Sequence, residues 1–224
     1  MSMESAGTMS VGQLWKKAFG FREMRVLLLW VVLLVAAVAM RGPRPWVLVR
    51  GLVLGVLAWV VTEYVFHRFF LHMPPPGWPP LRRLHARVHW QHHQTPADLP
   101  FLFVPWWGTP SLIGLAALAG YALGGLDLAL VAALGDALTL VHYEVTHLAA
   151  HVPYHPRTRL GALMKRHHLL HHFKNERYWF GVTNPVFDLL LATWPDPNAV
   201  PKSETARTLG IEPPETPAAV SQAR

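Results

Sequence analysis

The chain has 224 residues, of which 52% are hydrophobic and only 15% are charged. Soluble domains carry roughly 25% charged residues, so this composition favours one domain embedded in a membrane. The net charge of +7 does not indicate nucleic-acid binding, because lysines and arginines gather beside apolar segments and form no basic stripe. The sequence has no cysteine, which excludes disulfides, thiolate ligands and iron–sulfur clusters. Any metal must therefore be held by nitrogen and oxygen, and fourteen histidines are available.

The N-terminal segment, residues 1–23, is mostly polar and predicts an interfacial helix that lies on the membrane surface. Its apolar stripe stands among basic side chains and consists of Leu14, Trp15, Ala18 and Phe19. Unbroken apolar sequence follows at residues 26–40, which at 1.5 Å per residue covers about 22 Å. This segment needs its flanks to cross a hydrocarbon core of roughly 30 Å.

Two helical hairpins are predicted from the apolar segments. Residues 26–40 and 46–66 form the first hairpin, with a tight turn at Gly42-Pro43-Arg44-Pro45. Residues 111–124 and 126–147 form the second hairpin, which turns at its central glycine pair. The expected fold class is therefore an all-α integral membrane protein with four transmembrane helices.

Both hairpins would begin and end on the same side of the membrane. Most lysines and arginines flank the spans on that side, which the positive-inside rule identifies as cytoplasmic. We expect a multi-pass protein of the bacterial inner (cytoplasmic) membrane, with the active site and both termini in the cytoplasm. Residues 24–193 would form the membrane domain. The Pro-, Thr- and Ala-rich residues 194–224 predict a disordered C-terminal tail.

Ten histidines form four short clusters at or just beyond the ends of the predicted spans. The clusters are His67 with His72; His89, His92 and His93; His147 with His151; and His168, His171 and His172. Residues three or four apart share a helix face, so each HxxHH motif is expected to aim two or three imidazoles at one point. The first pair is five residues apart, about 140° around an ideal helix. Its two rings can converge only if the helix frays or bulges, or they serve different metals.

Ten imidazoles exceed what a single ion can hold, so the count predicts two ions with about five ligands each. Imidazole suits zinc, copper, iron and nickel. A structural zinc closes with four ligands, whereas five nitrogens leave a sixth octahedral position open for dioxygen or water. The count therefore favours iron over a structural ion.

Two carboxylates are candidates for orienting the histidine rings, because ligand histidines usually donate their second nitrogen to a carboxylate or a carbonyl. These are Glu144, three residues before His147, and Asp188. Pairing with a nearby arginine or lysine is an equal alternative for Glu144. Asp136 lies inside the fourth predicted span, where a charge is costly, and either function or packing would explain it.

At these residues the sequence resembles the fatty acid hydroxylase and sterol desaturase superfamily, in particular its fatty acid 2-hydroxylase branch. The resemblance covers residues 67–193. Residues 143–151, Tyr-Glu-Val-Thr-His-Leu-Ala-Ala-His, are similar to the branch's Tyr-Asp-x-Thr-His-x-x-x-His segment, with Glu144 replacing the usual aspartate. Residues 164–175, Met-Lys-Arg-His-His-Leu-Leu-His-His-Phe-Lys-Asn, followed by Gly181-Val-Thr and Asp188, resemble its C-terminal signature.

The resemblance implies four transmembrane helices beneath a cytosolic, histidine-rich helical cap that encloses a di-metal centre. It also implies that the ten clustered histidines are ligands of two metal ions. These ions would be iron in the working enzyme, and zinc could replace them in the purified protein. The histidines outside the pattern are His85, His142, His155 and His167. The implied reaction hydroxylates a lipid C–H bond, most simply in a fatty acyl chain, with dioxygen as co-substrate. No cytochrome b5 domain fits in this sequence, so electrons are expected from a separate ferredoxin- or cytochrome b5-like donor.

Other functions remain open at this point. A carotenoid, isoprenoid or sterol-like hydroxylase or desaturase would share the histidine pattern. A histidine-rich metal-binding or transport protein would not need catalysis, although transporters place their ligands within the bilayer. Apolar residues beside the ligands are expected to line the substrate route or to anchor the chain at the interface; they are Phe69, Phe70, Trp90, Leu169 and Phe173.

Overall fold

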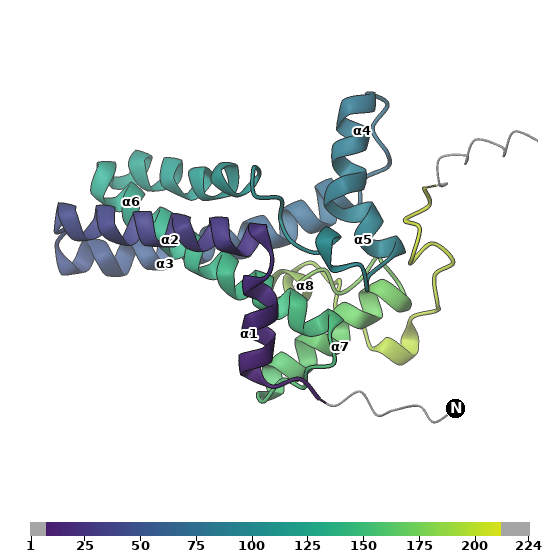
Figure 1. Cartoon of the computed structure of the whole chain (residues 1–224). Coiled ribbons are helices and arrows are strands. Elements are labelled where there is room, and N and C mark those ends of the chain that lie inside the picture. The colour runs from purple at the N-terminus through teal and green to yellow at the C-terminus, as the bar shows by residue number, and fades with distance from the viewer. Residues whose placement is uncertain (1–7, 212–224) are drawn as a thin grey trace, which may run out of the picture.

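The computed structural model describes residues 8–211, and its regular elements in that range are helices joined by turns and loops (Figure 1). In chain order they are α1 (Val11–Phe19), α2 (Arg22–Arg41), α3 (Pro45–Val65), η1 (Phe66–Leu71), α4 (Pro79–His85), η2 (Ala86–Trp90), α5 (Gln91–Gln94), η3 (Leu99–Phe101), α6 (Thr109–His151), α7 (Arg159–Phe173), α8 (Val186–Leu190) and η4 (Pro197–Ala199). Residues 1–7 of the predicted interfacial segment and 212–224 of the predicted tail lie outside the described residues.

Three long apolar helices run side by side and form one half of the molecule (Figure 1). α2, the continuous stretch of α3 and η1, and α6 each have the length and composition needed to cross a membrane, with mean hydropathies of 2.2, 1.8 and 1.8. The shorter helices α4, α5, α7 and α8 gather at one end of the long ones. The structure therefore confirms the all-helical prediction and contains three candidate spans.

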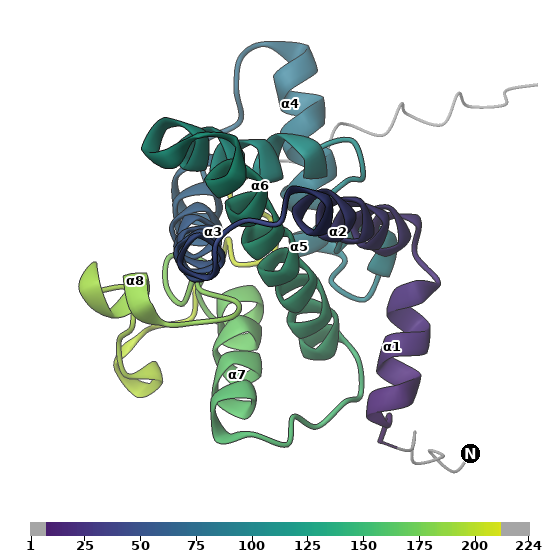
Figure 2. The same ribbon diagram turned by 90° about the vertical axis from the view of Figure 1, so that its left-hand side faces the viewer.

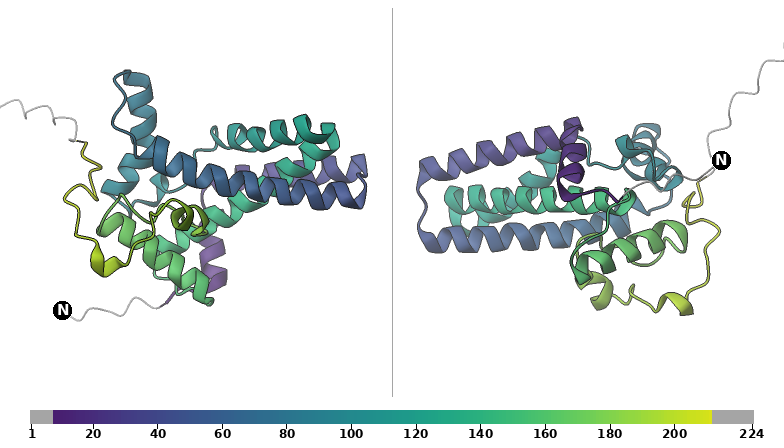
Figure 3. Two further views of the ribbon diagram at one scale, coloured as in Figure 1. Left: turned by 180° about the vertical axis from the view of Figure 1, so that it is seen from behind. Right: turned by 60° about the horizontal axis from the view of Figure 1, so that its bottom comes forward.

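α6 is bent back on itself at a glycine pair. Gly124 and Gly125 have non-helical dihedral angles, and Gly125 has φ of +75°, which side-chain-bearing residues rarely adopt. The two arms pack closely beside the turn (Figure 3). At Gly120 they are so close that an added Cβ would be 2.8 Å from the Cα of Ala129. The turn predicted at this glycine pair is therefore present.

Small residues let α3 and α6 approach each other closely. A Cβ added at Gly55 would lie 2.2 Å from the carbonyl oxygen of Ala132, and one added at Gly135 would lie 2.7 Å from that of Leu52. Asp136 is buried. Its backbone nitrogen lies at the same contact, 2.5 Å from the position of a Cβ added at Gly55. The backbone of Asp136 thus lies where α3 and α6 approach most closely.

The N-terminal helix α1 runs across the direction of the long helices (Figures 1 and 2). It begins with a capping box, in which Ser10 and Gln13 each accept a hydrogen bond from the other's backbone nitrogen. Leu14 and Ala18 are buried in a core cluster with Leu148 of α6. Part of the stripe predicted to face the membrane surface therefore packs against the protein itself.

Residues 194–211 belong to the segment whose composition predicts a disordered tail. Residues 194–211 follow a defined path beside α5 and α7 (Figure 3). The Ser203 nitrogen donates to the Lys174 carbonyl (2.7 Å), and the Trp90 indole donates to the Thr208 carbonyl (3.0 Å). Composition could not reveal this path, because backbone carbonyls held by distant side chains leave no pattern in the sequence.

Candidate metal centre

All ten histidines that the sequence predicts as ligands converge in two groups of five. Within each group, one ring nitrogen per histidine lies within 4.8 Å of the others. The first group consists of His67, His72, His89, His93 and His171. The second group consists of His92, His147, His151, His168 and His172. Four separate segments of the chain supply these side chains.

The five-residue spacing of His67 and His72 is accommodated by a π-helix. Phe66–Leu71 form η1, in which hydrogen bonds run from residue i to i+5 and each turn holds more residues than in an α-helix. This geometry returns His72 to the face of His67, with the ring centroids 5.0 Å apart. Of the alternatives left open by the sequence, a local bulge that serves one group is the one observed.

Each HxxHH motif is divided between the two groups. His89 and His93 are one helical turn apart and belong to the first group, whereas His92 belongs to the second. In α7 the groups are exchanged: His168 and His172 belong to the second group, whereas His171 belongs to the first. Two imidazoles of each motif therefore aim at one point, as expected, and the third serves the adjoining group. Residues i and i+4 share a face, and i+3 is rotated far enough to serve the adjoining group.

The two groups share a wall of stacked rings. The rings of His93 in the first group and His172 in the second are stacked, with their centroids 4.1 Å apart. His171 of the first group also approaches His172, with centroids 5.6 Å apart. Two ions bound here would therefore be close neighbours.

The unpaired nitrogens of the site fit transition-metal ions. The Nε2 atoms of His67, His93 and His172 are buried and have no hydrogen-bond partner within residues 8–211. Burial lowers the pKa of the His93 imidazole to about 3, and it lowers the pKa of His89 well below the ordinary value. The rings are thus neutral and keep a lone pair, which is the form that binds zinc, copper, iron or nickel.

Backbone carbonyls orient three rings of the first group. The Nδ1 atom of His67 donates to the carbonyl of Phe180 (2.5 Å) and that of His171 to the carbonyl of Tyr178 (2.7 Å). The Nδ1 atom of His93 likewise donates, to a carbonyl at residue 206 (2.9 Å). Each bond fixes the tautomer and leaves Nε2 free to face the centre of the group.

The loop that supplies two of these carbonyls is held in an unusual conformation. Trp179 lies between them with φ of +58°, which is costly for a bulky side chain and is found mostly at functional sites. The Asp188 carboxylate accepts from the nitrogens of Phe180 (2.9 Å) and Gly181 (2.7 Å) and from the Thr193 hydroxyl (2.7 Å). Asp188 therefore acts on the site through the loop.

Glu144 and Asp188 do not orient histidine rings directly, contrary to the prediction. Within residues 8–211, neither carboxylate is hydrogen-bonded to a histidine. Glu144 is buried and accepts from the backbone nitrogen of Val104 (2.8 Å), in the segment that leads into α6. The rings use carbonyls, the other partner that ligand histidines commonly take.

Glu63 was missed by the sequence analysis. It lies on α3 one turn before His67, is 5% exposed, and accepts from the backbone nitrogens of Val182 (2.6 Å) and Thr183 (2.9 Å) and from the Thr183 hydroxyl. It thus ties α3 to the loop that carries the histidine-orienting carbonyls. A carboxylate inside an apolar segment is an available signal, because it must be either paired or functional.

Lys165 was also missed as a structural residue. Its ammonium on α7 donates to the carbonyls of Ala149 (2.7 Å), Val152 (2.8 Å) and Tyr154 (2.8 Å), at the end of α6. Ala149 belongs to the last turn of α6, whose carbonyls have no partner inside the helix, and Val152 and Tyr154 follow the helix directly. Lys165 therefore fixes the end of α6, where His151 lies, to the helix that carries the last histidine motif. A single lysine has no sequence signal for such a role.

The other four histidines lie outside both groups, as predicted. His85 is buried and bonds through Nε2 to the carbonyl of Leu71 (2.7 Å), and the His167 ring packs at a tilt against Trp194 with centroids 4.0 Å apart. The exposed pair consists of His142 and His155.

An apolar cavity of about 360 Å³ opens onto both histidine groups. Its inner wall includes His67 and His89 of the first group and His92 and His147 of the second. Its outer wall is formed by α3, η1 and the beginning of α6. The size and apolar lining are typical of a site for a small or elongated apolar ligand.

One of the five residues predicted for the substrate route lines this cavity, namely Phe70. Phe69 is 58% exposed, and Trp90 is buried with its indole turned to the carbonyl of Thr208. Leu169 and Phe173 line a separate depression beside α7. The prediction chose residues by proximity in sequence to the ligands, but adjacent residues on a helix point about 100° apart.

The sequence matches the family model described as "Fatty acid hydroxylase" over residues 52–193. It is 32% identical over 160 residues to "Fatty acid 2-hydroxylase" from Mus musculus, an alignment covering 68% of this chain and 41% of the mouse protein. It is 29% identical over 165 residues to "Dihydroceramide fatty acyl 2-hydroxylase FAH1" from Arabidopsis thaliana, covering 68% and 63%. The chain thus spans less than two thirds of the length of these relatives.

The fold is also similar to a solved structure of full-length scs7p in which only the hydroxylase domain is visible. The TM-score is 0.69 at 27% sequence identity, and the match covers 80% of this chain and 68% of that one. The family match includes more than half of the chain and all four histidine clusters. The chain is a membrane protein that belongs to the fatty acid hydroxylase family, in its fatty acid 2-hydroxylase branch.

Proposed function

We propose that the two histidine groups each bind one iron ion, and that the protein hydroxylates a fatty acyl chain within the membrane. The observation that carries this proposal is the apolar cavity that opens onto both groups. Five neutral imidazoles per ion leave one octahedral position open, which a structural ion does not need. When bound, two redox-active ions would supply the activation of dioxygen.

The reaction balances as RH + O2 + 2 e⁻ + 2 H⁺ giving ROH + H2O. One oxygen atom enters the C–H bond of the chain, and the other leaves as water. The two electrons require a reductant, for which we propose a separate ferredoxin- or cytochrome b5-like carrier. The printed names of the relatives, fatty acid 2-hydroxylase and dihydroceramide fatty acyl 2-hydroxylase, support a fatty acyl substrate.

Substrate entry from the bilayer is supported by the outer wall of the cavity. Leu115 on the first arm of α6 and Trp107 just before it both line the cavity and are 49% and 48% exposed. They border the apolar surface of the candidate spans. An acyl chain entering through water instead would expose its methylenes at about 0.8 kcal/mol each.

The two arms of α6 are proposed to cross the membrane separately, which gives four spans. The turn between the arms lies beside the turn between α2 and α3, because Arg41 and Asp127 form an ion pair of 2.7 Å. At 1.5 Å per residue the first arm, residues 109–123, is about 22 Å long, so the aromatic residues before it would complete the crossing. The histidine-bearing helices would then form a cap at the opposite end.

The cap is proposed to be cytoplasmic. Two arginines, Arg41 and Arg44, lie at the turns opposite the cap, and the ion pair with Asp127 offsets the charge of Arg41. Lysines and arginines on the histidine-bearing side therefore dominate the charge bias, as positive-inside topology requires. These are Lys16, Lys17, Arg22, Arg25, Arg82, Arg83, Arg87, Lys165 and Arg166.

The experiment compares lipids of cells that express the wild type, His171→Ala or His155→Ala. The wild type and His155→Ala should produce a lipid that has gained one oxygen atom, and each should carry about two metal ions per chain. His171→Ala should lose the product and at least one ion. A wild type without bound metal, or a His171→Ala variant that keeps both the product and the metal, would refute the proposal.

A further inference from the structure

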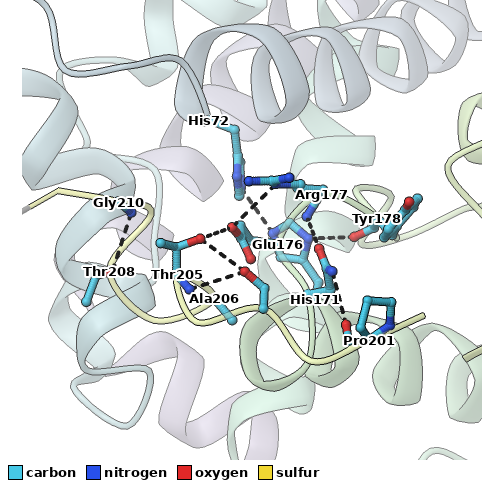
Figure 4. A network of polar contacts seen from close by, with 12 residues as sticks. His72, His171, Glu176, Arg177, Tyr178, Pro201, Thr205, Ala206, Thr208 and Gly210 are labelled. Atoms are coloured by element: carbon cyan, nitrogen blue, oxygen red, sulfur yellow. Dashed lines mark hydrogen bonds and ion pairs between the residues drawn. The ribbon is translucent and has the colours of Figure 1, made fainter.

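The segment after η4 crosses from α7 to α5 and lies beyond the family match, which ends at residue 193. We call residues 201–211 the C-terminal strap. At its start, the Asn175 side-chain amide donates to the carbonyl of Pro201 (3.2 Å), which fastens the strap to the end of α7. The Thr205 hydroxyl then donates to the buried carboxylate of Glu176 (2.6 Å; Figure 4).

The other half of the strap holds α5, a helix of a single turn that carries His92 and His93. The carbonyl of Ala206 accepts from the Nδ1 atom of His93 (2.9 Å). The Arg207 guanidinium donates to the backbone carbonyls of His93 (2.8 Å) and Gln94. α5 is the last turn of a continuous helical stretch with α4 and η2 over residues 79–94. A helix end leaves its last carbonyls without internal partners, and the Arg207 guanidinium satisfies two of them.

The histidine ring that the strap orients through the Ala206 carbonyl lies in the first group. His93 belongs to the first group, in which two further rings are also oriented by carbonyls of the C-terminal part of the chain. In the second group, by contrast, the Nδ1 atoms of His92, His168 and His172 are buried and have no partner within the described residues.

We propose that Arg207 is a positioning residue of the C-terminal strap, which orients the His93 ring for the metal of the first group and acts more weakly on the second group, through the backbone beside His92. The inference rests on the proposed binding of two ions. Arg207 caps the carbonyl end of α5, and this places the Ala206 carbonyl where it fixes the His93 tautomer. Outer partners of this kind typically change metal affinity by about 10- to 100-fold.

The test measures release of bound iron to a chelator from the full chain, without reference to activity. Arg207→Ala is combined with His168→Ala, which disables the second group, and separately with His89→Ala, which disables the first. With His168→Ala, adding Arg207→Ala should speed release of the remaining ion by roughly 10- to 100-fold. With His89→Ala the release rate should change much less, because the strap orients no ring of the second group. Arg207→Lys, which keeps the charge but not the two-pronged donor, should give an intermediate rate.

Lys202→Ala is the matched control, because Lys202 is an exposed cation of the same strap. Its release rates should equal those of the parent variants. Equal effects of Arg207→Ala in both backgrounds, or no effect in either, would overturn the role of the strap and leave the two-ion proposal standing. A wild type that binds no iron would instead refute the proposed function. Circular dichroism of each variant confirms that its helices are intact.

Discussion

The Nδ1 atom of His67 lies 2.5 Å from the carbonyl oxygen of Phe180, a residue 113 positions later in the chain. A carbonyl can only accept, so Nδ1 carries the proton and Nε2 keeps its lone pair for the first group. Asp188 holds the same loop from the other side by accepting from the nitrogens of Phe180 and Gly181. The orientation of a predicted ligand at the end of a candidate span therefore depends on a carboxylate that does not contact it.

Replacing Asp188 with asparagine should weaken the first metal position. The amide keeps the size of the side chain but presents an NH2 group where a backbone donor now meets an oxygen. One buried donor would lose its partner, at a cost of about 1–3 kcal/mol in folding stability. Metal content should fall toward one ion per chain, measured by elemental analysis beside thermal unfolding. Asp98→Asn, at an exposed aspartate, is the control, and equal behaviour of the two variants would contradict the role of Asp188.

The histidine site was predictable because its information is local. Helical spacing places residues i and i+4 on one face, and each HxxHH motif carries such a pair. Division of each motif between two groups was not predictable, since it depends on where α7 lies relative to α5. The His67–His72 spacing did indicate an irregular helix, and only the structure identifies it as a π-helix.

The contacts around the site were not predictable for a different reason. Its ring-orienting partners are backbone carbonyls, which every residue possesses, so the sequence marks none of them. The Glu144 carboxylate instead accepts from the backbone nitrogen of Val104. The strap around Ala206 lies in a segment whose composition predicts a disordered tail. The apolar cavity likewise depends on how α3 and α6 pack, and of the five residues chosen for their adjacency to the histidines only Phe70 lines it.

Gly55 should be essential for the packing of α3 against α6. A Cβ at this position would lie 2.2 Å from the Ala132 carbonyl oxygen, which is too close for any real contact. Gly55→Ala must separate the helices and should cost at least about 1–3 kcal/mol, as overpacking typically does. Gly114→Ala is the control, because a Cβ there meets nothing within 4 Å. Thermal stability in detergent should fall for the first variant and not for the second, and similar values would refute the close approach.

Topology can be tested cleanly because the sequence contains no cysteine. Ala97→Cys lies in an exposed loop on the histidine side, and Leu126→Cys follows the turn between the arms of α6. A membrane-impermeant maleimide applied to intact cells should label Leu126→Cys only. Ala97→Cys should react after permeabilisation. Labelling of both from the same side would exclude the two-hairpin arrangement, and the reverse pattern would place the site outside the cytoplasm.

The cavity should select substrates by chain length if it receives the acyl chain. Phe70→Ala widens its wall, and Leu115→Trp narrows it near the exposed edge. The first change should shift hydroxylation toward longer or bulkier chains and the second toward shorter ones, because the depth available to the chain changes while the histidines do not. Leu169→Trp, in the separate depression beside α7, is the control and should leave the product profile unchanged. The profile is measured by lipid mass spectrometry beside metal content. A uniform change in rate for every chain length, or loss of metal in the cavity variants, would show that these residues support the site and do not shape the substrate route.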